Sequence, residues 1–220
     1  MQVTLLHHTP IPVCSHAIRT CYQSFERGDN GGEKDLALIY KVGNKNKHGS
    51  TLEHLFYNFY IQGISRACLQ ELARHRIASL SVKSTRYTLK ELKHAQSFLP
   101  LDSINLTRAQ QFLVFCENER VNEASVLALE NLRKILSEGV SNDLAKFCMP
   151  ESYKTELSWS INARALQNFL ELRSSKHALW EIRKLAFCIF EALPQEHKFL
   201  FEECLESSKD ESPKDGDCAQ

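Results

Sequence analysis

The sequence has no surplus charge of either sign. Lysine and arginine together number 27, as do aspartate and glutamate, so the formal net charge of the 220-residue chain is zero. A chain without a positive field has little general attraction for nucleic acid or an acidic membrane. Long apolar runs are also lacking, and residues 1–12 have neither the basic flank nor the apolar length of a signal peptide. We therefore expect neither a nucleic-acid nor a membrane partner.

Several motifs of nucleotide-binding, hydrolytic and metal-dependent enzymes are absent as well. There is no P-loop, no GxGxxG after a predicted strand and no GxSxG elbow. No CxxC pair or HExxH motif occurs, and the spacing of His48 and His54 matches no known pair of zinc ligands. We expect no metal. Eight scattered cysteines without a signal peptide favour a reducing cytoplasm as the compartment.

The hydrophobic pattern predicts one domain over residues 1–205, which is long enough to bury a sizeable core. The charged tail, 206–220, contains serine and proline but no apolar periodicity, and is predicted to be disordered. Strands are predicted over 2–8, 55–63 and 155–162. Helices are predicted over 12–25, 33–48, 64–75, 107–137 in two pieces, 142–147, 163–173, 176–193 and 195–205.

The most informative stretch is Arg74-His75-Arg76, which ends the helix predicted over 64–75 and is followed by a polar loop. Successive residues of a helix point about 100° apart, so these side chains converge on one ligand only if the helix ends there. An anion such as phosphate suits the donors in this stretch, which are the arginine guanidinium groups, the Ser84 hydroxyl and the N–H groups of a turn. The alternative is that the three residues only solvate the end of a helix.

A second block, INARALQNFLELR, places an arginine on the buried side of a helix. Arg173 lies three residues after Leu170 and seven after Leu166, so it continues the apolar stripe. A guanidinium directed toward a core is costly unless it is paired. From the sequence, Arg173 has either an acidic partner or a ligand, and both possibilities stay open.

Polar side chains on the neighbouring face of the same helix complete this block. Asn162 stands where an asparagine caps a helix well. Arg164 and Asn168 are four residues apart and stack along one face, which suits donors along a flat polar heterocycle. A third block, HGSTLEH over 48–54, has a glycine that permits a tight turn before Ser50.

The three blocks together resemble the flavin-dependent thymidylate synthases. The matching stretches are HGSTLEH, GISRACLQELARHRIASLSVKSTRYT and SINARALQNFLELRSSKHALWEI, in the family's order. The central stretch has the signature of that family, in which RHR is followed after seven residues by serine and then by Arg-Tyr. The stretches cover about a quarter of the chain.

The resemblance implies an α/β (α+β) fold with an antiparallel or mixed sheet flanked by long helices. It implies methylation of dUMP to dTMP without a protein nucleophile. Methylenetetrahydrofolate would supply the carbon, and FAD, reduced by NADPH, would supply the hydride. It further implies a homotetramer whose active sites lie between subunits.

The resemblance also assigns roles to residues of this sequence. Arg173 would hold the uracil edge as the catalytic group, and His48 would lie where folate or nicotinamide stacks. Contacts to FAD would come from Ser50, Arg74, His75, Arg76, Asn162, Arg164 and Asn168. Contacts to dUMP would come from Glu71, Arg74, Ser84, Thr85, Arg86, Lys146 and Arg173.

Four positions depart from the common family pattern. Val82 stands where many members have a glutamate or glutamine, and Lys146 stands where arginine is usual and loses the bidentate fork. Glu71 replaces a glutamine and Thr51 a proline. A different function, a non-catalytic nucleotide- or RNA-binding module with the arginines as a phosphate clamp, is the alternative. A helical interaction scaffold is a third, but it leaves Arg173 without a purpose.

Overall fold

The computed structural model describes residues 1–205, so the predicted disordered tail, 206–220, lies outside the described residues. Two compact units are distinguished within it. Unit 1 comprises residues 1–62, 71–81 and those from 158 onward, and unit 2 comprises 63–70 and 82–157. The expectation of a single domain over 1–205 stays a prediction. None of the helices within the described part has the length and apolar content needed to span a membrane.

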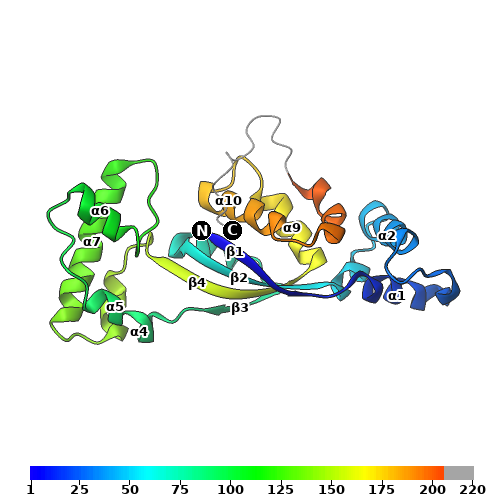
Figure 1. Cartoon of the computed structure of the whole chain (residues 1–220), viewed down its shortest axis with the longest axis horizontal. Coiled ribbons are helices and arrows are strands. Elements are labelled where there is room, and N and C mark those ends of the chain that lie inside the picture. The colour runs from blue at the N-terminus through cyan, green and yellow to red at the C-terminus, as the bar shows by residue number, and fades with distance from the viewer. Residues whose placement is uncertain (206–220) are drawn as a thin grey trace. The chain divides into compact units, whose positions relative to one another are not determined.

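Four strands form one sheet in the order β1-β2-β4-β3 (Figure 1). Their bounds are β1 Gln2–His8, β2 Phe56–Ser65, β3 Ala78–Val82 and β4 Lys154–Asn162. β1 pairs antiparallel with β2, with Gln2 opposite Gln62 and His8 opposite Tyr57. The combination of helices with this sheet confirms the predicted α/β (α+β) fold class.

The segment that contains β3 was predicted to be a polar loop, and that prediction was wrong. Its sequence, ASLSV, has low intrinsic strand preference, and three of its five residues are exposed. Hydrogen bonding to a neighbouring strand decides whether a segment forms a strand more than its own composition does. β3 is an edge strand beside β4, and this pairing stabilises a segment that composition alone does not predict as a strand.

In unit 1, helices α9 (Ala163–Arg173) and α10 (Trp180–Glu191) lie side by side on one face of the sheet (Figure 1). α9 begins where predicted because the side-chain oxygen of Asn162 accepts a hydrogen bond from the Ala165 amide at 2.8 Å. Its buried face includes Phe169, which packs edge-on against Trp159 of β4 with ring centroids 5.1 Å apart. This packing fixes the rotation of α9.

The N-terminal helices of unit 1 are α1 (Ile11–Tyr22) and α2 (Glu33–Ile39). α2 ends earlier than the helix predicted over 33–48, and residues Tyr40–Lys45 continue it as a π-helical turn. Gly43 lies in that turn, and a Cβ atom there would come within 2.7 Å of Leu52. Only glycine admits this approach, which packs the 3-10 turn Gly49–His54 against the π-helical turn Tyr40–Lys45.

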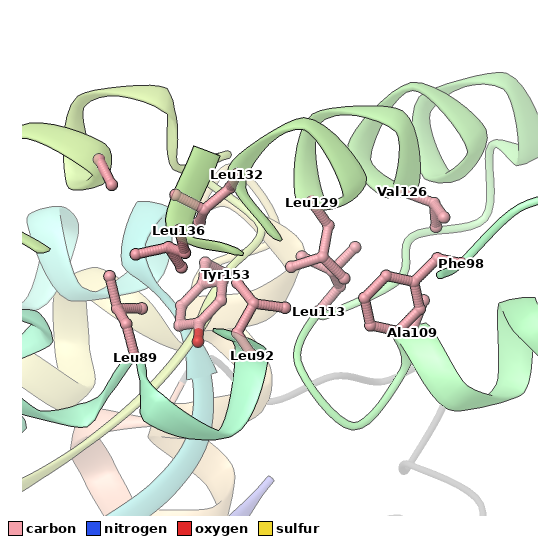
Figure 2. Packing of buried hydrophobic residues seen from close by; sticks show 11 residues of the cluster. Leu89, Leu92, Phe98, Ala109, Leu113, Val126, Leu129, Leu132, Leu136 and Tyr153 are labelled. Atoms are coloured by element: carbon pink, nitrogen blue, oxygen red, sulfur yellow. The ribbon is translucent and has the colours of Figure 1, made fainter. Parts of the chain in front are cut away.

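Unit 2 is helical around its own core. Its helices are α4 Thr85–Thr88, α5 Lys90–Lys93, α6 Ser103–Ala109, α7 Glu119–Ser137 and α8 Asn142–Ala145, while α3, Arg66–Leu72, starts in unit 2 and ends in unit 1. Figure 2 shows Leu129, Leu132 and Leu136 of α7 directed at Leu92 and Tyr153. The helical region predicted over 107–137 is thus two helices, as expected, and the first begins at Ser103.

A carboxylate inside unit 2 joins α7 to the segment before α6. Glu130 is 1% exposed and accepts hydrogen bonds from the Phe98 amide and the Ser97 hydroxyl, each at 3.1 Å. Arg133, one turn later, pairs with it at 2.7 Å. The hydrogen bond from Arg133 outweighs the effect of burial and lowers the pKa of Glu130 to about 2. The charge is therefore retained throughout the neutral range.

Replacing Glu130 by glutamine should destabilise the protein by about 3 kcal/mol at pH 7, because Arg133 loses its partner in a buried site. A depressed carboxyl pKa contributes stability above the unfolded value of 4.5 and loses it as the pH falls toward 2. The difference between wild type and Glu130→Gln should therefore shrink below pH 4.5. Urea unfolding followed by circular dichroism measures it.

Glu123→Gln is the matched control, because Glu123 lies on the same helix with its side chain exposed. It should change the free energy of unfolding by less than about 0.5 kcal/mol. Equal effects of the two substitutions would contradict the role given to Glu130.

Candidate functional site

A pocket of about 810 Å³ lies within unit 1. Its walls come from the turn after α3, from the start and the exposed side of α9, and from the 3-10 turn before β2. The lining residues are Glu53, Arg74, His75, Arg76, Ile77, Asn162, Arg164, Ala165, Asn168, Leu172 and Arg173. Seven predicted site residues from two of the sequence blocks therefore meet in this pocket, and Glu53 of the third block lines it as well.

The Arg74-His75-Arg76 run lies where helix α3 has already ended. α3 stops at Leu72, earlier than the predicted residue 75, and the amides of Arg74 and His75 bond to the carbonyls of Glu71 and Leu72 at 3.3 and 3.1 Å. Each of these hydrogen bonds joins an amide to the carbonyl three residues earlier, which makes a tighter turn than that of an α-helix. The chain then enters β3, so the three side chains fan out around the pocket as the sequence predicted.

Arg173, the last residue of α9, has both an acidic partner and a place in the pocket. Its Nη1 pairs with Oε2 of Glu71 at 2.7 Å, and its Nη2 donates to the Glu71 carbonyl at 3.3 Å. The Arg173 side chain is 18% exposed and that of Glu71 is 43% exposed. Of the two possibilities that the sequence left open, the acidic partner is therefore confirmed, and contact with a ligand stays a prediction.

His75 accepts the third hydrogen bond from this guanidinium. Its Nε2 lies 3.0 Å from Nε of Arg173, and its ring packs edge-on against Phe169 with centroids 5.0 Å apart. Burial and the Arg173 charge lower the pKa of His75 to about 4, while Glu71 acts in the opposite direction. The imidazole is therefore neutral near pH 7, and because Nε2 accepts, its proton lies on Nδ1.

On the opposite side of the pocket, Arg164 pairs with Glu53 at 2.7 Å. A Cβ atom at Gly49 would come within 2.9 Å of Nε of Arg164, so the glycine of the HGSTLEH block lets this side chain pass. Ser50 lies in the same 3-10 turn and His48 directly precedes it. Neither of these two predicted residues is among those that line the pocket.

The other predicted substrate residues belong to unit 2. Thr85 and Lys146 line a separate pocket of about 350 Å³, together with Arg66, Gln70, Phe147, Met149, Pro150 and Glu151. Arg86 lies in α4, pairs with Asp143 at 3.4 Å and is largely exposed. Ser84 stands at the position before α4 without capping it by a side-chain bond. Unit 2 therefore supplies its own cluster of cations and hydroxyls.

Sequence reasoning missed three charged residues of these pockets, Glu53, Arg66 and Glu151. Glu53 was overlooked although it lies inside the HGSTLEH block, and its ion pair with Arg164 marks it as a wall of the pocket. Arg66 begins α3 and adds a second cation beside Lys146. Its place at the start of the second matching stretch was the available signal.

The charges of the unit 1 pocket suit a planar anionic ligand. Four arginines line it, whereas Glu53 and Glu71 are the acidic groups that pair with two of them. The amides of Asn162 and Asn168 add neutral donors and acceptors at the start of α9. Over residues 1–205 no group of three or more histidine, cysteine or acidic side chains is arranged to hold a metal ion.

Comparison with known proteins agrees with the geometry. The model of the family described as "Thymidylate synthase complementing protein" matches residues 4–197. The flavin-dependent thymidylate synthase of Wolinella succinogenes is 70% identical over 201 residues, which are 91% of this chain and 97% of that protein. The corresponding protein of Campylobacter jejuni strain RM1221 is 68% identical, over 93% of this chain and 98% of its own length.

A solved structure resembles the whole described fold. Thymidylate synthase X from Helicobacter pylori, crystallised with FAD and dUMP, superposes with a TM-score of 0.91 at 63% identity. The superposition covers 94% of this chain and 100% of the H. pylori chain.

The network around His75 predicts pKa shifts of opposite sign. Arg173→Met should raise the pKa of His75 from about 4, because the guanidinium charge disfavours the imidazolium, and Glu71→Gln should lower it. NMR titration of the labelled imidazole measures both shifts.

Arg27→Met is the control for these shifts, since Arg27 is exposed and its ion pair is with its neighbour Glu26. It should leave the His75 titration unchanged. Movement of the His75 pKa in the same direction in the Arg173 and Glu71 variants would contradict the network.

Proposed function

The chain belongs to the family of flavin-dependent thymidylate synthases, and we propose that it converts dUMP to dTMP with FAD bound in the pocket of unit 1. The observation that carries this proposal is the convergence of seven predicted ligand residues on one pocket. These residues come from two blocks about 90 positions apart in the sequence, and neither block alone specifies a ligand. The family match extends over nearly all of the described chain, residues 4–197.

The residues present fit FAD. A dinucleotide needs cations for its pyrophosphate, polar partners for its ring edges and a pocket of several hundred Å³. Arg74, Arg76 and Arg164 supply the cations, and Asn162 and Asn168 supply the amides. We assign these residues and His75 to FAD, with Ser50 beside them in the turn that Gly49 permits. When bound and reduced, FAD supplies the hydride of the reaction.

For dUMP, the two ends of the nucleotide need different partners. The phosphate needs cations and hydroxyls, which we assign to Arg86, Lys146, Ser84 and Thr85 of unit 2. The uracil needs a planar donor, which we assign to Arg173, with Glu71 and Arg74 along the sugar and base. Lys146 holds phosphate as a point charge, so it tolerates a wider range of phosphate positions than an arginine does.

Arg173 is the catalytic group of this proposal. C5 of uracil is a weak nucleophile until electron density moves into the ring, and negative charge then develops on the ring nitrogen and carbonyls. A guanidinium that is only 18% exposed stabilises that charge more than it would in water. Its hydrogen bonds to Glu71 and His75 exist before substrate binds, so little reorganisation is needed.

The remaining assignments concern the co-substrates and the assembly. We propose methylenetetrahydrofolate as the carbon donor and NADPH as the reductant, with His48 near the position where folate or nicotinamide stacks. We further propose a cytoplasmic homotetramer in which the active sites lie between subunits. In such an assembly the clusters of unit 1 and unit 2 from different copies can serve one active site.

The phosphate-clamp alternative without catalysis makes a different prediction for Arg173. A clamp needs only charge, whereas a uracil-binding guanidinium must sit in a desolvated pocket with a fixed orientation. The three hydrogen bonds that orient Arg173 favour the enzyme.

The test is tritium release from C5-labelled dUMP in the presence of FAD, NADPH and methylenetetrahydrofolate. The wild-type protein should release tritium, and Arg173→Ala should lose activity by about a hundredfold or more while still binding FAD. Flavin absorbance of the purified protein monitors the cofactor.

Arg27→Ala, at an exposed ion pair of unit 1, is the matched control and should retain full activity. No tritium release by the FAD-saturated wild type would overturn the proposed function. Loss of FAD from Arg173→Ala would instead show that the assignment of Arg173 is wrong.

A further inference from the structure

The guanidinium of Arg173 is held at three of its atoms. Nη1 binds the Glu71 carboxylate at 2.7 Å, Nη2 donates to the Glu71 carbonyl at 3.3 Å, and Nε donates to Nε2 of His75 at 3.0 Å. An arginine has five N–H donors, so these bonds commit three and leave two. Because the guanidinium is planar, fixing three of its donors also fixes where the other two point.

His75 is better placed to hold Arg173 than to act on a ligand directly. Its side chain is 8% exposed, its Nε2 is occupied by Arg173, and Phe169 packs against its ring. Phe169 in turn packs against Trp159, so the imidazole is held against the buried core. Arg173 therefore contacts the acceptor nitrogen of His75 directly.

The contact requires a particular chemical state of His75. A neutral imidazole with its proton on Nδ1 presents a lone pair at Nε2, but an imidazolium has only donors and repels a guanidinium. Burial and the Arg173 charge favour the neutral state. Glu71 accepts from Nη1 and Nη2 of Arg173, and His75 is the acceptor of the Nε–H.

We propose that His75 is a positioning residue for uracil binding: its neutral Nε2 fixes the Nε–H of Arg173, so that the two remaining donors present one defined edge to a planar ligand with two acceptors. The proposal rests on the proposed function, in which that ligand is the uracil ring of dUMP. It goes beyond the assignment of His75 to the flavin, because it makes the histidine act through the arginine.

A pair of substitutions separates the acceptor from the rest of the side chain. Glutamine carries its amide oxygen about as far from the backbone as Nε2 of histidine, whereas asparagine is one methylene shorter and does not reach Arg173. His75→Gln therefore keeps the acceptor and His75→Asn removes it. Both variants remove the imidazole, so a role that depends on the ring itself is lost equally in the two.

The first measurement is the exchange of the Arg173 Nε proton with water, followed by NMR on FAD-loaded protein. The bond to His75 should slow this exchange in the wild type and in His75→Gln, and His75→Asn should exchange at least tenfold faster. This readout needs no dUMP, so it tests the contact even if the proposed function fails.

The second measurement is the dissociation constant for dUMP of the same FAD-loaded proteins, obtained by calorimetry. Loss of a hydrogen bond to a charged group weakens binding by on the order of tenfold. We therefore expect the dissociation constant of His75→Asn for dUMP to rise by about that factor. His75→Gln should stay within about threefold of the wild type.

A double-mutant cycle then assigns the effect to Arg173. Arg173→Lys keeps the charge but has no Nε–H, so adding His75→Asn to it should change dUMP binding by less than about twofold. The cycle supports the proposal when the effect of His75→Asn disappears in the lysine background.

Two outcomes would overturn the proposal. They are equal weakening of dUMP binding by His75→Gln and His75→Asn, and an effect of His75→Asn that persists in Arg173→Lys. The proposed function fails separately, if the wild type binds no dUMP and releases no tritium, whatever the exchange of the Arg173 Nε proton shows.

Discussion

The interaction on which the unit 1 site depends is the hydrogen-bonded ion pair between Arg173 and Glu71. A half-buried guanidinium without a partner would be expelled toward water, and the inner end of α9 would move with it. Glu71 supplies the carboxylate and a carbonyl, and His75 supplies a neutral acceptor. Because Glu71 lies in the last turn of α3 and His75 in the turn after it, one network joins this segment to the end of α9. The same network forms the wall of the pocket.

The fold makes this network possible by fixing both of its ends. Asn162 caps the start of α9, Phe169 packs against Trp159, and Arg173 follows one turn later on the same face. On the other side, α3 stops at Leu72 and the chain turns into β3. The residues Arg74 to Arg76 therefore lie in a short connection between two ordered elements, where neighbouring side chains can point in different directions.

Much of this was predictable from local pattern. The bounds of α9 and its cap follow from periodicity and from Asn162, and both agree with the structure, while Arg173 at the end of the apolar stripe is partly buried. The strand β3 was not predictable, because a serine-rich segment becomes a strand only through its neighbour β4. The pairing of Arg164 with Glu53 also depends on tertiary contact across 111 residues. The roles of Ser84, Thr85, Arg86 and Lys146 stay predictions, because they concern contacts with a ligand and between subunits.

The central claim is that Arg173 is oriented before the substrate arrives and binds its base. A crystal structure of this chain with FAD and dUMP tests the claim most directly. We expect a uracil carbonyl within hydrogen-bonding distance of Arg173 while the Nε contact to His75 persists, with the flavin against residues 74–76 and the start of α9. A uracil ring bound elsewhere, or an Arg173 that has left His75, would contradict it.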